Sequence, residues 1–412
     1  MKRQFVVLLG SRGFAAVMQA VLFGLLARSV TASTFGLVTA FTGVVGVLLV
    51  LTGAGMAGVI SRAHAQADHD AVASAIRLTV WSGFITAFAI TLFVVAWSLA
   101  VGGVPLAIAL IAMALVIERT SDAALNVPIA DGQVTLSTWP ILLRRVVAVV
   151  LLVVGLTAGF DPIWSYAVAT FFGAVSAQWL TRRIVRHPER GTVAARALIR
   201  DGSPYMWTTL SGQVRMLDTA LVAAVVGPAA AGGYAAASKL VQPALLVPQT
   251  IASLVLPRSA RLDATDSRRL VRPLVLACAT SFVVVLPLMI FAGPLLTLVM
   301  GQDYASSAPI LRWLLVGMPF FALTVPLLAL LQGQGRARLG AVSSVVFAVL
   351  LLVDIVVGAL LGGSVGAAIG LSSTFALQAV VLVVTVRLTL GAEPRATQSA
   401  SATSAGAVDA TG

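Results

Sequence analysis

Long apolar stretches follow one another along almost the entire chain. About twelve of them reach the roughly 20 residues that a helix needs to cross the hydrocarbon core of a bilayer. Their apolar residues are continuous rather than alternating, which excludes a membrane β-barrel. Charged residues make up 10% of the 412 residues, against about 25% in an ordinary soluble domain. The sequence therefore predicts an all-α integral membrane protein with no sizeable soluble domain.

The apolar stretches divide into two sets of six. The expected spans lie near residues 5–27, 35–60, 77–101, 105–127, 138–159, 162–181, 204–226, 232–256, 273–299, 308–331, 339–361 and 365–389. They define an N-terminal six-helix lobe at 1–181 and a C-terminal six-helix lobe at 204–390. A basic cytoplasmic linker at 182–203 joins the lobes, and the small, polar tail at 391–412 is predicted to be disordered.

Short matches between the two halves indicate an internal repeat. Phe35-Gly36 follows the first span, and Gly233-Tyr234 stands in the corresponding place after the seventh. Because each copy has an even number of spans, both copies have the same orientation. A pseudo-two-fold axis along the membrane normal would then relate the lobes, as in transporters built from parallel repeats. Two similar lobes facing one another would enclose a cavity.

The arginines concentrate in alternate loops, after the second, sixth, eighth and tenth spans, and the remaining loops have almost none. This is the distribution that the positive-inside rule describes, so both termini are expected on the cytoplasmic side. The rule also accounts for the net charge of +12, and we therefore expect no nucleic-acid partner.

Several charged and amide side chains fall inside the expected spans. A cation near the bilayer centre costs about 2.5 to 3.5 kcal/mol even on the most lenient insertion scale, so such residues are kept where something uses them. The candidate substrate-binding side chains, all on the spans that open the two lobes, are Arg12, Gln19, Gln213, Arg215, Lys239 and Gln242. Cations beside amide donors in an apolar cavity favour a multiply charged anion such as phosphate or pyrophosphate.

Two of these arginines also have a structural interpretation. Arg12 lies close enough to the end of its span for its side chain to reach the cytoplasmic headgroups. Asp218 follows Arg215 by three residues on the same helical face, so the two could neutralise each other. Otherwise Asp218 could couple transport to H⁺ or Na⁺, and the sequence leaves both roles open.

A second charged cluster lies on the fourth span. Glu118, Arg119 and Asp122 are spaced to share one helix face. They predict either a local ion network at the membrane boundary or a gating or proton-coupling site. Arg144 and Arg145, on the fifth span, are interpreted as boundary arginines.

Motifs for catalysis are weak. The three histidines all lie in expected loops, and no span offers a metal-binding or nucleophile constellation. Asp68-His69-Asp70 has the D-x-D form found at metal–nucleotide-sugar sites, but no domain beside it could hold a nucleotide. We therefore expect neither an enzyme nor a cofactor.

Residues around the seventh and eighth spans carry a family resemblance. Asp218 near the start of an apolar run, Gly227, Gly233-Tyr234 and Lys239-Leu240 recur in order there, and the turn LLGGSVGAAIG has a similar Gly-Ala-Ala pattern. With the opening FVVLLGSRGFAAVMQAVLFGLLARSVTASTFGLV, they resemble the polysaccharide-transporter, O-antigen-flippase branch of the multidrug/oligosaccharidyl-lipid/polysaccharide (MOP) exporter superfamily. The resemblance covers residues 5–390.

The resemblance implies a MATE-like transporter in a bacterial cytoplasmic membrane. It would move polyprenyl-pyrophosphate-linked oligosaccharide to the outer leaflet for cell-surface polysaccharide or lipopolysaccharide synthesis, with lobes that rock between inward-open and outward-open states. Its implied partners are the lipid-linked oligosaccharide, membrane lipids and the polysaccharide polymerase or glycosyltransferases.

Two other functions stay open at this point. A cation-coupled multidrug-type exporter would need a cavity dominated by carboxylates. A non-transporting scaffold for polysaccharide assembly would tolerate the loss of the charges inside the membrane.

Overall fold

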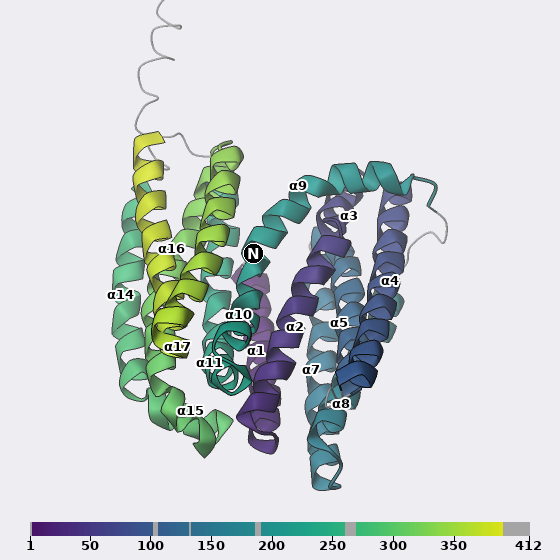
Figure 1. Cartoon of the computed structure of the whole chain (residues 1–412). Helices are drawn as coiled ribbons and strands as arrows, with labels where there is room; N and C mark the ends of the chain where they lie inside the picture. The colour runs from purple at the N-terminus through teal and green to yellow at the C-terminus, as the bar shows by residue number, and fades with distance from the viewer. Residues whose placement is uncertain (1, 102–105, 132, 186–190, 260–268, 390–412) are drawn as a thin grey trace, which may run out of the picture.

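The chain is a bundle of helices in the computed structural model, which describes residues 2–101, 106–131, 133–185, 191–259 and 269–389 (Figure 1). The predicted tail at 391–412 lies outside the described residues. Within the described ranges there is no β-strand. The all-α prediction is confirmed.

Two packed groups of helices meet along the middle of the molecule. The helices of the first bundle are α1 (Lys2–Ser29), α2 (Ala32–Thr52), α3 (Met56–Ala65), α4 (His69–Val101), α5 (Ala107–Ala124), α6 (Asn126–Ala130), α7 (Val134–Thr157) and α8 (Pro162–Ile184). Helix α9 (Ala195–Gln213) then leads to the second bundle. The second bundle contains η1 (Val214–Leu217), α10 (Asp218–Val225), α11 (Pro228–Val241), η2 (Gln242–Leu245), α12 (Leu246–Ser259), α14 (Val271–Ile290), α15 (Ala292–Met300), η3 (Gln302–Ser307), α16 (Ala308–Gly333) and α17 (Ala337–Thr389).

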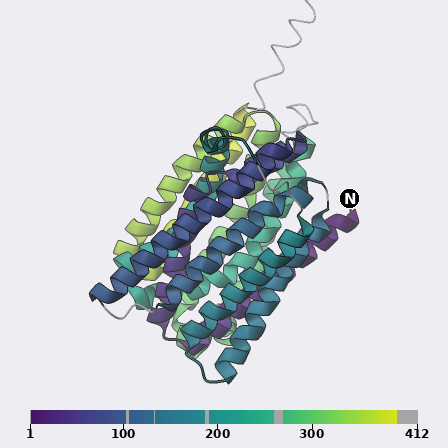
Figure 2. The same ribbon diagram turned by 90° about the vertical axis from the view of Figure 1, so that its right-hand side faces the viewer.

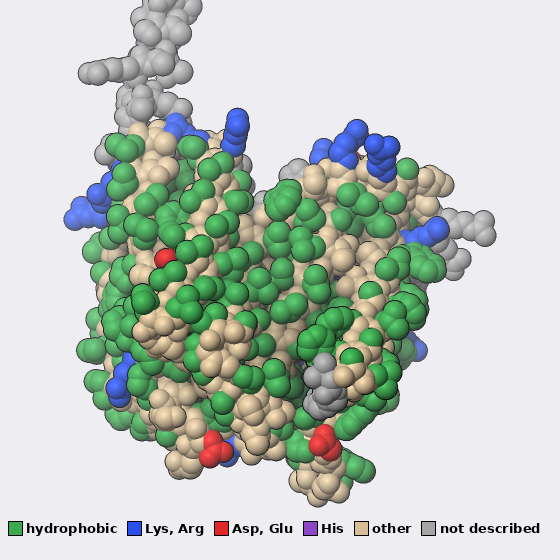
Figure 3. Space-filling view, viewed as in Figure 1, with side chains coloured by type: hydrophobic (Ala, Val, Ile, Leu, Met, Phe, Trp, Pro, Cys, Tyr) green, Lys and Arg blue, Asp and Glu red, His purple; other side chains and the backbone are tan. Residues whose placement is uncertain are grey.

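Many of these helices present apolar side chains on the outside of the molecule. The visible face is largely hydrophobic (Figure 3), and side chains such as Leu99 and Leu361 are 84% exposed. In the described residues, the stretches long and apolar enough to cross a membrane are Ala32–Thr52, His69–Ala100, Thr135–Thr157, Val271–Ile290, Gln302–Gly333 and Arg338–Thr389. Apolar surface of this extent would be insoluble in water, and lipid is its natural solvent.

Helix ends follow the turn residues in the sequence. Asp161 caps α8, because its carboxylate accepts hydrogen bonds from the backbone N–H groups of Ile163 and Trp164. Gly227 has a φ of 116°, which favours glycine, and Pro228 after it occupies the first turn of α11. The long helix α17 is likewise broken at Gly362 and Gly363, between the eleventh and twelfth expected spans.

Breaks also occur inside stretches that we predicted as single spans. The expected span 35–60 divides into α2 and α3 at a turn where Ala54 and Gly55 both have positive φ. The expected spans 204–226 and 232–256 each contain a 3₁₀ segment, η1 and η2. Apolar run length does not reveal such interruptions, and the count of twelve membrane crossings stays a prediction.

Within the first bundle, α4, α5, α7 and α8 pack side by side, and α12, α14, α16 and α17 do so in the second (Figures 1 and 2). The bundles meet mainly through α2, which packs against α10 and α11, and through α1, which lies along α7 but also contacts η2, α12 and α15. The space-filling view shows a notch between the bundles at the end where most of the visible Lys and Arg side chains gather (Figure 3).

Helix α9 arches over this end of the molecule and contacts α3, α4 and α17 (Figure 1). It begins within the segment predicted as a linker. The residues just before it are anchored on the start of α4. The backbone N–H and hydroxyl of Thr192 both donate to the carboxylate of Asp70, at 2.9 and 2.6 Å. The linker therefore makes specific contacts with the first bundle rather than being a fully solvated loop.

The contact between α2 and α11 depends on glycine. A Cβ atom on Gly232 would lie 1.9 Å from the backbone oxygen of Ala32, and one on Gly36 would lie 2.3 Å from that of Pro228. Small residues at a helix interface let the two backbones approach closely. The helices that carry Phe35-Gly36 and Gly233-Tyr234 are thus in direct contact across the two bundles.

We expect Gly232→Ala to lower the free energy of unfolding by about 1–3 kcal/mol, because an overpacked interface must move apart. Unfolding of the purified protein in mixed detergent micelles measures this change. Gly340→Ala is the matched control, since a Cβ there meets only a Leu328 methyl group at 3.6 Å. Equal stability of the two variants would contradict the close contact of α2 and α11.

Candidate functional site

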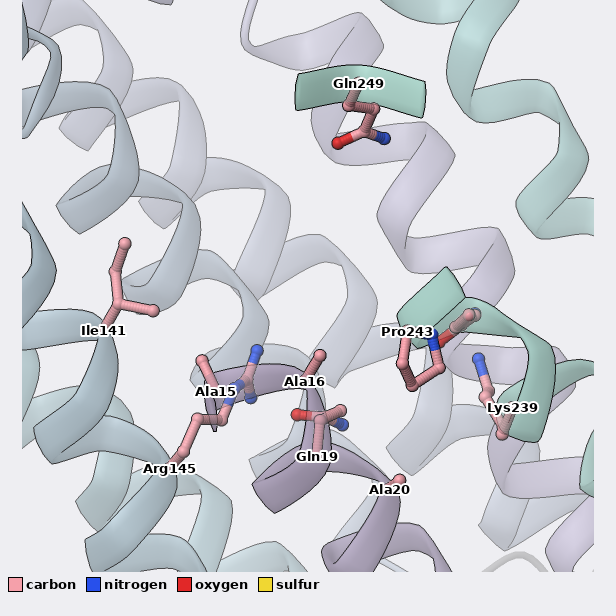
Figure 4. A pocket seen from close by; sticks show the side chains of 10 residues that line it. Ala15, Ala16, Gln19, Ala20, Ile141, Arg145, Lys239, Pro243 and Gln249 are labelled. Atoms are coloured by element: carbon pink, nitrogen blue, oxygen red, sulfur yellow. The ribbon is translucent and has the colours of Figure 1, made fainter. Parts of the chain in front are cut away.

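A cavity of about 420 Å³ lies between the two bundles (Figure 4). Its walls come from α1 and α7 on one side and from α11, η2 and α12 on the other. The lining residues are Ala15, Ala16, Gln19, Ala20, Ile141, Arg145, Lys239, Gln242, Pro243 and Gln249. Its volume is within the range of about 300–1,000 Å³ that ligand pockets occupy.

Both charged residues of this lining are cations, and they come from opposite bundles. Arg145 extends from α7 and Lys239 from α11, on facing sides of the cavity (Figure 4). The Lys239 ammonium lies 4.9 Å from the centre of the Phe23 ring, a cation–π contact. Lys239 forms no ion pair with any residue that the structure describes. A cavity with two cations and no carboxylate in its lining is suited to an anion.

Amide side chains complete the polar part of the cavity. The Gln19 side-chain oxygen is buried and has no hydrogen-bond partner among the described residues. Gln242 begins η2, and Pro243 next to it has no N–H to continue an α-helical ladder. The break in the helix therefore places an amide and a lysine, three residues apart in sequence, at the same cavity wall.

The structure separates the predicted cationic surface into two places. Gln19, Lys239 and Gln242 line the cavity between the bundles. Arg215 and Gln213 instead line a second cavity of about 440 Å³, within the second bundle. The backbone of Arg12 belongs to α1, but its side chain lies outside the described part of the structure.

Arg145 was missed as a cavity residue, because it was interpreted as a boundary arginine. Instead, Arg144 and Arg145 are the partners of the two carboxylates on α5. The carboxylate of Glu118 lies 3.1 Å from the guanidinium of Arg144 and 2.8 Å from that of Arg145. Asp122 lies 3.2 Å from Arg144. In this ion network, α5 supplies the acids and α7 the bases.

Arg119 takes no part in the network. It forms no ion pair with any described residue, although it neighbours Glu118 in sequence. The sequence did contain a signal for the true partners. The fourth expected span has two carboxylates four residues apart, and the fifth has an Arg-Arg pair. The two negative and two positive charges on consecutive spans could have indicated this pairing.

Asp218 is buried, with 6% of its surface exposed. Its carboxylate accepts hydrogen bonds from the Thr219 hydroxyl at 3.1 Å and the Ser238 hydroxyl at 3.2 Å. Arg215 is not within ion-pair distance, and a space of about 10 Å³, close to that of one water molecule, lies among Arg215, Asp218 and Ser238. Tyr234 interacts electrostatically with the carboxylate, but its hydroxyl does not reach hydrogen-bond geometry. Neutral donors thus hold Asp218 directly.

Comparison with known proteins gives a family and a fold. The sequence profile of a family described as "Polysaccharide biosynthesis protein" matches residues 1–263. No curated protein sequence matches the chain significantly.

Solved structures of several MOP transporters share the fold. A multidrug-resistance MATE family transporter of the MOP superfamily, in its inward-facing conformation, aligns with a TM-score of 0.71 and 16% identity, over 92% of this chain and 95% of that one. The lipid II flippase MurJ, in an inward closed conformation, aligns with a TM-score of 0.70 and 12% identity, over 93% and 87%. A MOP-superfamily transporter from Pyrococcus furiosus, described as having a binding pocket of reverse polarity, aligns with a TM-score of 0.67 and 14% identity, over 95% and 96%.

Proposed function

Because the chain belongs to the polysaccharide biosynthesis protein family and has the fold of a MOP-superfamily transporter, we propose that it is a lipid-linked oligosaccharide flippase. It translocates polyprenyl-(pyro)phosphate-linked oligosaccharide across a bacterial cytoplasmic membrane by alternating access. Both termini and the notch between the bundles are then on the cytoplasmic side, and the notch admits the substrate headgroup.

The observation that carries this proposal is the pair of cations in the cavity between the bundles. Arg145 and Lys239 face each other without a carboxylate in the lining. A pyrophosphate between them accepts charge-assisted hydrogen bonds from both bundles at once. Gln242 and Gln19 supply further amide groups from each side. The anion therefore contacts both lobes of the repeat and is positioned to bias their relative movement.

The same cavity disfavours the multidrug-type alternative. An exporter of organic cations needs negative charge in its binding cavity, and here the acids lie elsewhere. Glu118 and Asp122 are paired with arginines, and Asp218 is buried among hydroxyl groups. Asp218, held by neutral donors, is the candidate for H⁺ or Na⁺ coupling in the flippase cycle.

Reconstitution tests the function directly. Vesicles containing the protein and a fluorescent polyprenyl-pyrophosphate oligosaccharide are followed for access of the label to a membrane-impermeant quencher. We expect the labelled oligosaccharide to cross the membrane only in vesicles that contain the protein. If Asp218 couples transport to H⁺ or Na⁺, an imposed gradient of that ion should change the translocation rate. Export of a cationic dye with no glycolipid movement would favour the multidrug alternative. Inactivity of the vesicles, with full cellular function after replacement of Arg145 and Lys239 by apolar residues, would favour a scaffold.

A further inference from the structure

The second cavity, inside the second bundle, has amide, hydroxyl and aromatic side chains among the aliphatic residues of its lining. We propose that it binds the sugars of the lipid-linked substrate, while the cavity between the bundles binds the pyrophosphate. This assignment rests on the proposed flippase function and adds a glycan site to it. The cavity lies among α9, η1, α12, α16 and α17, and its volume is about 440 Å³.

The polar lining of this cavity has the chemistry that sugar hydroxyls need. Four glutamines from four different elements face it: Gln213, Gln249, Gln332 and Gln378. A glutamine amide both donates and accepts hydrogen bonds, as a sugar hydroxyl does, so each can pair with a hydroxyl in either direction. Ser and Thr hydroxyls in the same lining act in the same way. Inside a membrane bundle, such polar side chains are costly unless a polar ligand or water meets them.

Aromatic side chains form the apolar part of the wall. Three of the 17 phenylalanines line this one cavity: Phe321, Phe347 and Phe375. Phe321 and Phe375 lie against each other with ring centres 5.0 Å apart. The C–H faces of a sugar ring are apolar and pack well on aromatic rings. A wall that combines amides with aromatic faces is therefore suited to an oligosaccharide.

Arg215 is the one charged residue among the described lining of this cavity. Its guanidinium lies 5.6 Å from the centre of the Phe321 ring, a cation–π contact that orders the side chain at the wall. Asp218 offsets part of its charge from a distance. The cavity therefore accepts a neutral glycan or one that carries a single acidic group, rather than a second pyrophosphate.

The two cavities adjoin at one residue. Gln249 lines both of them, and it lies on α12, which follows the η2 break beside Lys239. In a lipid-linked oligosaccharide the first sugar is bonded directly to the pyrophosphate. A headgroup held by Arg145 and Lys239 would therefore place its first sugar on the Gln249 side, toward the second cavity.

A cavity-filling variant separates this proposal from the general flippase function. Ala348 lines the second cavity, so Ala348→Trp occupies the proposed sugar site. Val349, the next residue of α17, is 58% exposed on the outer surface, and Val349→Trp is the matched control. Three probes are titrated against each purified variant. They are farnesyl pyrophosphate, the lipid-linked oligosaccharide extracted from the cells that make the protein, and the free glycan released from it by mild acid.

We expect Ala348→Trp to weaken binding of the extracted lipid-linked oligosaccharide and of the free glycan at least tenfold, and to leave the affinity for farnesyl pyrophosphate unchanged. Val349→Trp should bind all three probes like the unmodified protein. Gln378→Leu, a milder change, should weaken both glycan-containing probes by about three- to tenfold through the loss of one hydrogen-bonding amide.

Equal affinity of Ala348→Trp and Val349→Trp for the glycan probes overturns the assignment of the second cavity. Loss of farnesyl pyrophosphate binding in Ala348→Trp also overturns it, because the two parts of the ligand would then share one site. Failure of the unmodified protein to bind farnesyl pyrophosphate, with intact binding of the free glycan, contradicts the pyrophosphate role of the first cavity and supports the glycan site.

Discussion

Lys239→Met is expected to bind farnesyl pyrophosphate about 10- to 100-fold more weakly than the unmodified protein, because it loses a charge-assisted hydrogen bond of about 1.5–3 kcal/mol. Lys239 has no ion-pair partner among the described residues, and it faces the cavity between the bundles. Its charge is therefore available to a ligand. Arg145, across the cavity, is already paired with Glu118. The loss at Lys239 should exceed that for Arg145→Gln.

Stability distinguishes this effect from damage to the fold. A partly buried lysine inside a membrane bundle is costly when no acid pairs with it, so Lys239→Met should unfold at the same temperature as the unmodified protein or at a higher one. Lys239→Arg retains the cation and should retain most of the affinity. Titration calorimetry in detergent gives the affinities, and a thermal unfolding curve gives the stability. Undiminished binding by Lys239→Met would remove this residue from the proposed site.

Arg144→Leu is expected to lower the free energy of unfolding by about 1–3 kcal/mol, because it removes the central cation of a partly buried ion network in which the Asp122 side chain is 40% exposed. The Arg144 side chain is 6% exposed and contacts both Glu118 and Asp122. Its removal leaves Asp122 without a partner, and Arg145 alone opposite Glu118. Unfolding in mixed detergent micelles measures the change.

Arg119→Leu is the matched control for this network. Arg119 is the immediate neighbour of Glu118 and carries the same positive charge as Arg144. It forms no ion pair among the described residues. The control should change the free energy of unfolding by less than about 1 kcal/mol. A variant in which Asp122→Asn accompanies Arg144→Leu should recover part of the stability, since it removes the unpaired charge. A larger loss for Arg119→Leu than for Arg144→Leu would show that the network is wrongly described.

The helix ends were the most predictable part of the fold. Asp161-Pro162, Gly227-Pro228 and Gly362-Gly363 interrupt the apolar runs in the sequence, and helices end or start at each of them. Local chemistry decides these points: a capping carboxylate, a proline in the first turn, or a glycine free to adopt unusual backbone angles. The breaks at η1 and η2 were not predicted, although Arg215 in η1 and Pro243 in η2 interrupt the apolar sequence there.

The sequence predicted some of the residues that line the cavity between the bundles, but not all of them. A cationic, amide-rich surface was expected from Lys239, Gln19 and Gln242, and these residues do share one cavity. Arg215 was expected beside them but lines the neighbouring cavity. Arg145 was not expected there at all. Its place depends on the rotation of α7 against α1 and α8, and a single sequence does not specify which faces of three helices meet.

By itself the sequence determined that this is a helical membrane protein, because span length, apolarity and helix capping depend on residues within about 20 positions of one another. The sequence also places the chain in the polysaccharide biosynthesis protein family. The tertiary structure alone decided which charges neutralise each other and which stay available to a ligand. Arg144 and Arg145 on α7 pair with Asp122 and Glu118 on α5, which lie 22 to 27 residues away in the sequence. Lys239 has no acid within ion-pair distance among the residues that the structure describes. Those pairings depend on side-chain packing between distant segments, where a turn of about 100° in one helix would exchange every partner.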